Sequence, residues 1–418
     1  MLEVEKKNNS SSVMLYFIFT WHSVFLALTM SMIDLNTILP TLINILTDSK
    51  IVLGALYSIL LAAPLLFNII FSYYMSSFKY RRRFLITGIY LRAISFLLIA
   101  IVVYFFAAKS PSITLGSLFF LIFLFSTSGG MAGIAYGDLI SKIVPKNMRA
   151  RLYSIKQFAG SVASFLGAVL VSKIFSTEGF TFPANYSLSF FIGFLGLMIA
   201  SITFWLIKEP ASKVNNNEKS SFGSLIKSIP KILKDDPNFF KFILVENFSS
   251  FSLMVLPFYI IFAQEFLYTD SSYIGKFLFF QIIGTISSNV MWGVLGNHFG
   301  VKNVVSICIL IGGIIPLIAI LLSNFPPMYF SIVFILIGFV ISGRRIGFEP
   351  YLLEIAPPEQ TIVYLGIRGT LNLFTVLLPL LGGFFIQFFG YIFTFVLVSI
   401  MMFISFFLLK RKGNKKPA

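Results

Sequence analysis

The chain has 418 residues, of which 57% are apolar and only 11% are charged, about half the charged fraction of a typical soluble protein. This composition excludes a soluble protein, and the continuous apolar runs exclude a membrane β-barrel, whose strands alternate apolar and polar residues. The net charge of +16 is therefore no sign of a nucleic-acid partner, and the question it raises is which side of the membrane carries it.

The apolar runs recur along the whole chain, and each is long enough to cross a bilayer as a helix of about 20 residues. We expect an all-α integral membrane protein with twelve transmembrane helices in two six-helix bundles, 1–207 and 239–418, joined by a linker over 208–238. The expected spans are 14–39, 51–77, 84–107, 113–138, 152–175, 187–207, 239–264, 271–295, 302–322, 328–349, 362–388 and 391–409.

Lysine and arginine residues indicate which loops face the cytoplasm. One set of loops is basic, with residues at 79–83, 142–151, the linker, Lys302 and 410–412. The opposite loops hold little beyond Lys50, Lys109 and Lys173. Because basic loops remain in the cytoplasm, both termini and the linker are expected there, in a multi-pass protein of the cell membrane.

The linker contains a stretch of helical periodicity. Its apolar residues recur at helical spacing beside lysines: Phe222, Leu225, Ile226, Ile229, Ile232 and Leu233. This pattern fits either a helix on an anionic membrane surface or an amphipathic helix packed on the protein itself, and the sequence leaves both open.

The two halves of the chain contain an internal repeat. The stretch GDLISKIVPKNMRARLYSIKQ after the fourth span aligns without gaps with EPYLLEIAPPEQTIVYLGIRG after the tenth. Pro145 then meets Pro357, and Lys156 meets Arg368. A parallel repeat of six plus six helices is a known transporter design, with the substrate path between the halves.

The loop between the second and third spans of each half resembles the signature loop of the major facilitator superfamily. The second half has glycines, an Asn-His pair and a basic end, whereas the first half keeps only the basic end. The resemblance implies a cytoplasmic hinge in which basic groups meet carboxylates at neighbouring helix ends. The residues it selects are Lys79, Arg82, Arg83, Asp138, Gly293, Asn297, Gly300, Lys302 and Glu349.

Asp34 is the strongest candidate for proton coupling. It lies late in the first expected span, in MIDLNTILP, which resembles the first-span motif of drug–proton antiporters of the superfamily. A carboxylate in a low-dielectric cavity can alternate between protonated and ionised forms. The alternative is a helix-end carboxylate in a wet vestibule. Glu246 and His22 are further proton-coupling candidates.

Ionisable groups inside a span face a cavity or a partner, because lipid does not solvate them. Four arginines lie at such depth: Arg92, Arg344, Arg345 and Arg368. An arginine paired with Glu246 would form a gate or a static bridge, and clustered arginines would hold an anionic substrate. Polar residues expected to line the path are Asn36, Asn68, Asn247, Gln281, Asn289 and Asn372.

The chain has no nucleotide-binding loop, metal cluster or nucleophile–base arrangement, so neither an ATP-driven pump nor an enzyme is expected. We therefore expect a monomeric secondary transporter of a small organic solute that works by alternating access without a cofactor. Proton coupling and efflux are favoured. Uptake of a metabolite, or a transporter-fold sensor or assembly protein without transport, are the alternatives.

Overall fold

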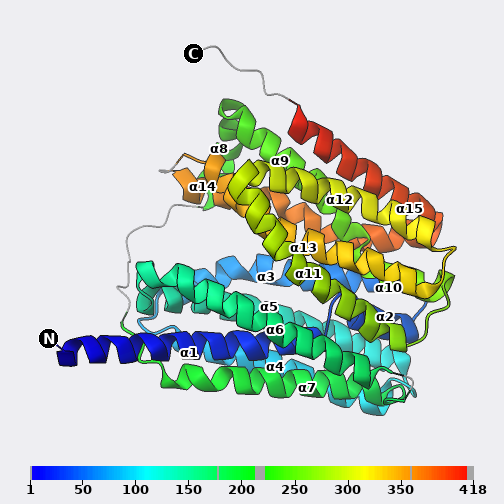
Figure 1. Ribbon diagram of the computed structural model, residues 1–418, viewed down its shortest axis with the longest axis horizontal. Helices are drawn as coiled ribbons and strands as arrows, with labels where there is room; N and C mark the ends of the chain where they lie inside the picture. Colours follow the sequence, from blue (N-terminus) through cyan, green and yellow to red (C-terminus); the bar gives the residue numbers. More distant parts are fainter. Residues whose placement is uncertain (1, 177, 212–221, 358–359, 412–418) are drawn as a thin grey trace. The chain divides into compact units, whose positions relative to one another are not determined.

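A computed structural model describes residues 2–176, 178–211, 222–357 and 360–411 (Figure 1). These residues form helices and contain no strand. The chain divides into two compact units. Unit 1 holds the described residues of Met1–Thr47, Ile59–Asn217 and Ser271–Phe279, and unit 2 holds those of Asp48–Ser58, Glu218–Asp270 and Phe280–Ala418.

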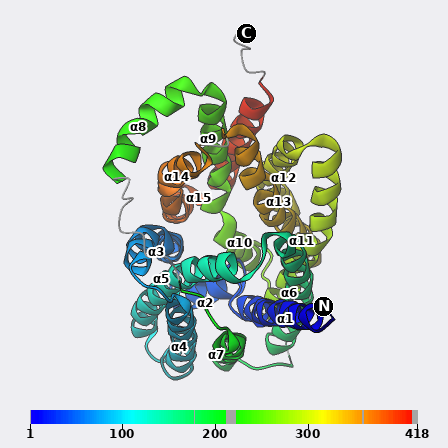
Figure 2. The same cartoon turned by 90° about the vertical axis from the view of Figure 1, so that its left-hand side faces the viewer.

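Unit 1 is built on long helices that run side by side (Figures 1 and 2). Its elements are α1 (Leu2–Met32), α2 (Ile38–Leu46), most of α3 (Lys50–Ser76), α4 (Arg82–Phe106), α5 (Pro111–Ile143), α6 (Lys146–Ile174), α7 (Ala184–Ile202) and the 3-10 turn η1 (Thr203–Leu206). Within it α4 packs on α5 and α7, and α1 packs on α6 and α7.

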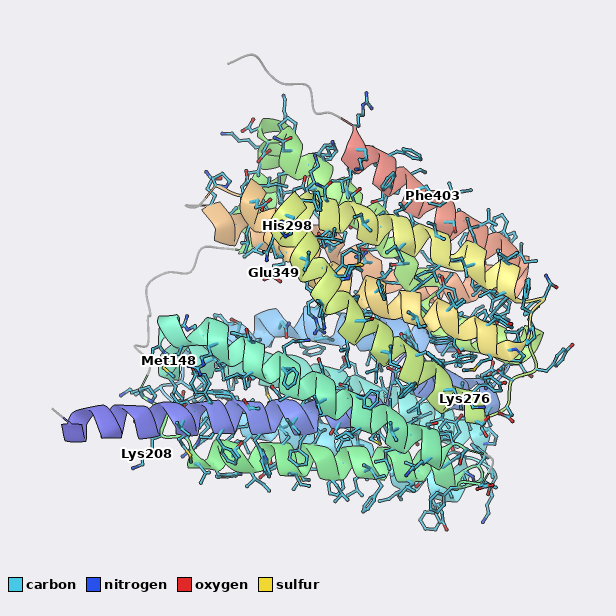
Figure 3. All side chains as sticks on the ribbon, viewed as in Figure 1. Met148, Lys208, Lys276, His298, Glu349 and Phe403 are labelled. Carbon is cyan, nitrogen blue, oxygen red and sulfur yellow. The ribbon has the colours of Figure 1, made fainter. Side chains whose placement is uncertain are left out.

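Short polar side chains join the unit 1 helices inside an aromatic core. The Ser189 hydroxyl donates a 2.6 Å hydrogen bond to the Met32 carbonyl, and Thr29 donates to the Gly193 carbonyl at 3.2 Å. These bonds satisfy the hydroxyls where water is absent and fix α1 against α7. In Figure 3, Met148 and Lys208 lie at the same end of unit 1, as expected for two predicted cytoplasmic loops.

Unit 2 contains more interrupted helices than unit 1. Its elements are α8 (Phe222–Asp235), α9 (Pro237–Ser249), η2 (Ser250–Met254), η3 (Leu256–Phe258), α10 (Tyr259–Phe266), most of α11 (Ser272–Phe299), α12 (Val301–Leu322), η4 (Pro327–Phe330), α13 (Ser331–Ile355), α14 (Thr361–Leu371), η6 (Asn372–Leu377) and α15 (Leu378–Lys410). Here α12 packs on α13 and α15, and α15 packs on α9.

Two glycines let α11 and α13 touch backbone to backbone in unit 2. A Cβ atom at Gly284 would lie 2.2 Å from the Ile335 carbonyl oxygen, and one at Gly338 would lie 2.2 Å from the Gln281 carbonyl oxygen. Small residues at such crossings are the usual means of tight helix packing in lipid.

Eleven helical segments in the described residues are long and apolar enough to span a membrane. The last, Val363–Lys410, has 48 residues, or about 72 Å of helix, more than twice the hydrocarbon thickness of about 30 Å. Gly390 interrupts this segment with a φ of +82°, a value that favours glycine. The segment therefore corresponds to the two predicted spans 362–388 and 391–409.

The predicted end of the first span is wrong. The expected span 14–39 breaks after Met32, and α2 starts as a separate helix at Ile38. In the turn between them, the Asp34 carboxylate accepts local hydrogen bonds that compete with helical backbone bonds. The spacing of apolar residues does not reveal such a competition.

The linker helix is α8, which packs on α9 and α14. Ile229 of the predicted apolar stripe is buried, so at this position α8 packs on its own unit. The predicted solvated stretch at 212–221 lies outside the described residues. At the other end of the linker, the Asp236 carboxylate caps α9 by accepting hydrogen bonds from the backbone N–H groups of Asn238 and Phe239, both at 3.0 Å.

Candidate functional site

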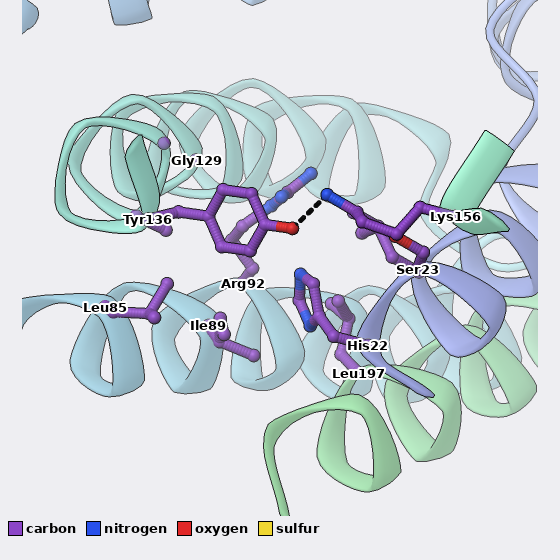
Figure 4. A pocket seen from close by; sticks show the side chains of 12 residues that line it. His22, Ser23, Leu85, Ile89, Arg92, Gly129, Tyr136, Lys156 and Leu197 are labelled. Carbon is purple, nitrogen blue, oxygen red and sulfur yellow. Dashed lines mark hydrogen bonds between the residues drawn. The ribbon is translucent and has the colours of Figure 1, made fainter. Parts of the chain in front are cut away.

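A cavity of about 180 Å³ lies among the helices of unit 1 (Figure 4). Its polar lining comes from four helices, with His22 and Ser23 on α1, Arg92 on α4, Tyr136 on α5 and Lys156 on α6. The remaining lining is apolar or small: Leu26, Leu85, Ile89, Gly129, Ala132, Gly133 and Leu197. The cavity therefore brings two fixed cations into the interior of a transmembrane unit.

Arg92 is held chiefly by aromatic and sulfur contacts. Its guanidinium carbon lies 4.4 Å from the centre of the Phe125 ring, and one terminal nitrogen lies 3.9 Å from the Met30 sulfur. Its Nε atom is buried and has no hydrogen-bond partner in the described part of the chain. A thioether is a weak acceptor, so most donor capacity of the guanidinium is unused.

Lys156 and Tyr136 form a second polar group in the same cavity. The Lys156 ammonium donates a hydrogen bond to the Tyr136 hydroxyl and lies 4.6 Å from the centre of that ring. His22 packs against Tyr136 at 5.5 Å between ring centroids, and its Nδ1 lies 3.3 Å from the Ala200 carbonyl oxygen. Figure 4 shows the ends of the Lys156, Tyr136 and Arg92 side chains converging on one space.

The sequence identified only part of this site. Arg92 and His22 were predicted to face the path, and both line the cavity. Lys156 and Tyr136 were missed as site residues. The repeat contained the signal for Lys156, because it aligns with Arg368, an intramembrane arginine of the second half.

Asp34 lies outside this cavity lining and outside regular helix. One carboxylate oxygen accepts hydrogen bonds from the Asn36 backbone N–H at 2.9 Å and from the Thr37 hydroxyl at 3.0 Å. Asp34 is half-buried and Asn36 is buried. The carboxylate therefore organises the turn between α1 and α2, and its coupling role stays a prediction.

Unit 2 holds a buried ion pair between Glu246 on α9 and Arg368 on α14. The Arg368 Nε atom lies 3.0 and 2.9 Å from the two Glu246 oxygens, and Nη2 lies 2.5 Å from Oε1. Only 3% of Glu246 is exposed. Among the three arginine partners that the sequence proposed for Glu246, this geometry selects Arg368.

Arg344 is held by serine oxygens. It donates to the carbonyl and hydroxyl of Ser249 at 3.1 and 3.0 Å, and to the Ser250 hydroxyl at 3.0 Å. Both serine hydroxyls donate in turn to the Glu246 carbonyl oxygen at 2.8 Å. Arg345 is exposed.

Two 3-10 breaks adjoin the ion pair. η2 follows α9 directly after Ser249, η6 follows α14 from Asn372, and the two breaks contact each other. Because 3-10 turns have poorer hydrogen-bond geometry than α-helix, a mid-span 3-10 segment is a common hinge. The amide oxygens of Asn247 and Asn372 are buried beside these breaks without a partner in the described residues.

A second cavity, of about 200 Å³, lies in unit 2 and is lined in part by Arg344. Apart from Arg344, Ser252 and Tyr259, its lining is apolar. The residues that the sequence proposed as path-lining lie outside the linings of both cavities: Asn36, Asn68, Asn247, Gln281, Asn289 and Asn372. Asn289 instead accepts a 2.5 Å hydrogen bond from Ser342.

A cluster of charges ties together one end of unit 1. The Asp138 carboxylate pairs with Arg81 at 2.5 Å and with Lys142. The predicted partners of Asp138 were Lys79, Arg82 and Arg83, and this prediction is wrong because Lys79 and Arg83 are exposed and the Arg82 guanidinium donates to the Ile207 carbonyl.

Glu209 completes this cluster, a role that no motif in the sequence predicted. Its carboxylate accepts from the backbone N–H groups of Arg81 and Arg82 and from the Lys142 ammonium, all at 2.8 Å. It thus caps the start of α4 from the stretch that follows η1. Burial opposes ionisation, but these hydrogen bonds outweigh it and hold the pKa of the Glu209 carboxyl below its usual value.

The corresponding loop of unit 2 depends on Gly300. Its φ of +78° between α11 and α12 is one that side chains disfavour, which explains the glycine of the signature loop. Gly293 faces open space and Lys302 is exposed. Glu349 is also exposed, and Figure 3 shows it and His298 toward the same end of unit 2.

Comparison with known proteins identifies the family. The model of the Major Facilitator Superfamily matches residues 21–275 and 242–418, which together cover nearly the whole chain. The chain belongs to the Major Facilitator Superfamily. The resemblance noted from the signature loop and the repeat is therefore confirmed, and the fold is that of a membrane transporter.

Solved structures agree with this fold. The nucleoside transporter NupG and a point mutant of it each match with a TM-score of 0.70 and 14% sequence identity. The match covers 95% of this chain and 100% and 99% of those chains, respectively. At this identity the likeness establishes the superfamily fold alone. No curated protein sequence matches the chain.

The low pKa of Glu209 predicts a pH-dependent contribution to stability. A carboxyl whose folded pKa lies below its unfolded value, about 4.3, stabilises the fold above that value and loses this effect as the pH falls through the folded pKa. We expect Glu209→Gln to lower the free energy of unfolding by about 1 kcal/mol at pH 7, a partly screened charged interaction. Below pH 4 the difference from wild type should narrow.

Thermal unfolding in detergent between pH 7 and pH 3.5 measures this difference. Glu178→Gln, which neutralises an exposed carboxylate, is the matched control and should follow wild type throughout. A Glu209→Gln deficit that stays constant down to pH 3.5 would show that the charge of Glu209 is not what stabilises this end of α4.

The Glu246–Arg368 pair predicts strong coupling between two mutations. Either Glu246→Gln or Arg368→Gln leaves one charge buried without its partner, which should cost about 3–5 kcal/mol in the state where the pair is closed. The double variant should recover part of that loss. Thermal unfolding of the single and double variants measures the coupling, with Glu178→Gln, an exposed carboxylate of unit 1, as the control. Strictly additive losses would reject the pair.

Proposed function

We propose that this chain is a secondary active transporter that moves a small organic solute across the cell membrane by alternating access. The observation that carries the proposal is the polar cavity of unit 1, built from four transmembrane helices of a Major Facilitator fold. Polar and charged groups are costly at this depth, and a solute path is the usual reason for them.

In this proposal the bundles 1–207 and 239–418 move as two bodies joined by the linker 208–238. The 3-10 breaks η2 and η6 supply hinges within the second bundle. The Glu246–Arg368 pair acts as a gate between α9 and α14 that breaks and reforms during the cycle. A buried carboxylate and guanidinium separate only when water or solute replaces the partner. Opening of the pair therefore requires water or solute to enter between α9 and α14.

We further propose proton-driven efflux, with Asp34 as the coupling carboxylate. Glu246 is the weaker candidate because protonating it would leave the Arg368 cation without its partner. His22 lines the cavity, and is the second candidate. The basic loops support a cytoplasmic location for both termini and the linker. We propose a monomer.

Flux through proteoliposomes tests both the transporter and the coupling residue. A panel of labelled solutes (uridine, benzoate, phenylalanine and tetraphenylphosphonium) is offered under an imposed pH gradient of either direction. We expect gradient-driven movement of at least one solute by wild type. Asp34→Asn should reduce gradient-driven accumulation at least tenfold while one-for-one exchange of the same solute continues, because only the proton step needs an ionisable group.

Asp48→Asn, an exposed carboxylate beyond α2, is the control and should transport as wild type does. His22→Gln tests the second candidate. If Asp34→Asn accumulates solute as well as Asp48→Asn does, Asp34 is not the coupling site. If no solute moves through wild type, while one of them still binds, the chain is a sensor of that solute rather than its transporter.

A further inference from the structure

The two cations of the unit 1 cavity have no compensating negative charge among the residues that the structure describes. No carboxylate is among the residues that line the cavity. The ion pairs found in the described residues use Lys50, Arg81, Lys142 and Arg368, and include neither Arg92 nor Lys156. A half-buried guanidinium and ammonium without counter-charge destabilise the protein unless a partner arrives from outside.

Unit 2 provides an internal comparison. There Arg368 is paired with Glu246, and Arg344 is held by three oxygens of Ser249 and Ser250. The chain therefore does supply acceptors for intramembrane cations where they serve the structure. Arg92 has no oxygen acceptor among the described residues, and this difference points to a ligand.

Arg92 is suited to recognising a planar or tetrahedral anion. The Phe125 ring packs on its guanidinium. Its Nε atom is buried, and no described residue accepts a hydrogen bond from it. An arginine fork binds a carboxylate or phosphate through two parallel hydrogen bonds. Lys156 supplies a second charge as a point donor, and the Tyr136 hydroxyl that it contacts adds a further polar contact beside it.

The rest of the cavity restricts the body of the ligand. About 180 Å³ admits only a small molecule, below the range of about 300–1,000 Å³ typical of drug-sized ligands. The rest of the lining includes leucine and isoleucine side chains and the His22 and Tyr136 rings, which pack against each other. A small anion with an apolar or aromatic body fits this lining better than a neutral polyhydroxylated one.

We propose that the unit 1 cavity binds the carboxylate or phosphate group of a small organic anion through Arg92 and Lys156. This anion is the transported solute if the proposed function holds. Binding itself needs neither a gradient nor transport, so the two proposals fail separately.

Binding to purified full-length protein in detergent tests the inference with four probes. Benzoate and phenyl phosphate are small aromatic anions, uridine is a neutral solute, and short-chain phosphatidylglycerol supplies the same phosphate chemistry from a lipid. Isothermal titration and thermal shift are read at low and high salt. We expect one or both aromatic anions to bind wild type, and more weakly at high salt.

Variants assign the binding to the two cations. Arg92→Gln and Lys156→Gln should each weaken anion binding at least tenfold, and without ligand Arg92→Gln should unfold at a higher temperature than wild type because an uncompensated charge is gone. Arg92→Lys keeps the charge but loses the fork, and should bind with intermediate affinity. Arg151→Gln, an exposed cation on the same helix as Lys156, should bind as wild type does.

Three results would overturn the inference. They are uridine binding without binding of either aromatic anion, anion binding that Arg92→Gln and Lys156→Gln leave unchanged, and binding of phosphatidylglycerol alone. Anion binding lost in both variants, but without flux in proteoliposomes, would support this inference and reject the proposed transport.

Discussion

The cost of holding charge inside a membrane governs this molecule. An apolar chain of this kind needs no arginine in its spans to fold, so each one must be stabilised locally or serve a purpose. The two units differ in how they meet this constraint. Unit 2 surrounds Arg368 and Arg344 with a carboxylate and serine oxygens, whereas unit 1 leaves Arg92 and Lys156 facing a cavity. From this difference we propose that unit 1 binds the solute and that the ion pair of unit 2 opens and closes.

The link in unit 2 is placed where the backbone is least regular. The Glu246–Arg368 pair joins α9 and α14 just before each turns into a 3-10 segment, and the contact between η2 and η6 continues that junction. An ion pair beside two 3-10 segments can stabilise one backbone conformation of these segments, and its opening allows another conformation. At the end of unit 1, by contrast, the carboxylates of Glu209 and Asp138 fasten regular helix ends to each other. That cluster joins the start of α4, the end of α5 and the stretch after η1 through charged contacts.

Much of the fold was predictable because lipid imposes a strong length and composition rule on every span. The ion pair was also predictable, since the sequence places Glu246 and few possible partners at similar depth. Sequence failed where hydrogen bonds between distant segments decide the geometry. The sequence placed Asp34 inside a span, whereas its hydrogen bonds to the following turn end the helix before it. The sequence placed Glu209 in the linker, whereas its carboxylate caps α4. Lys156 was visible only as the repeat counterpart of Arg368.

The central claim is that the uncompensated cations of unit 1 receive a charge carried by the solute. Charge movement recorded from proteoliposomes on a solid-supported membrane tests it directly, because the transient current follows the entry of charge into the protein. We expect a transient current on a rapid change to benzoate or phenyl phosphate, no current on a change to uridine, and loss of the anion response in Arg92→Gln. An equal current in wild type and Arg92→Gln, or a response to uridine alone, would contradict it.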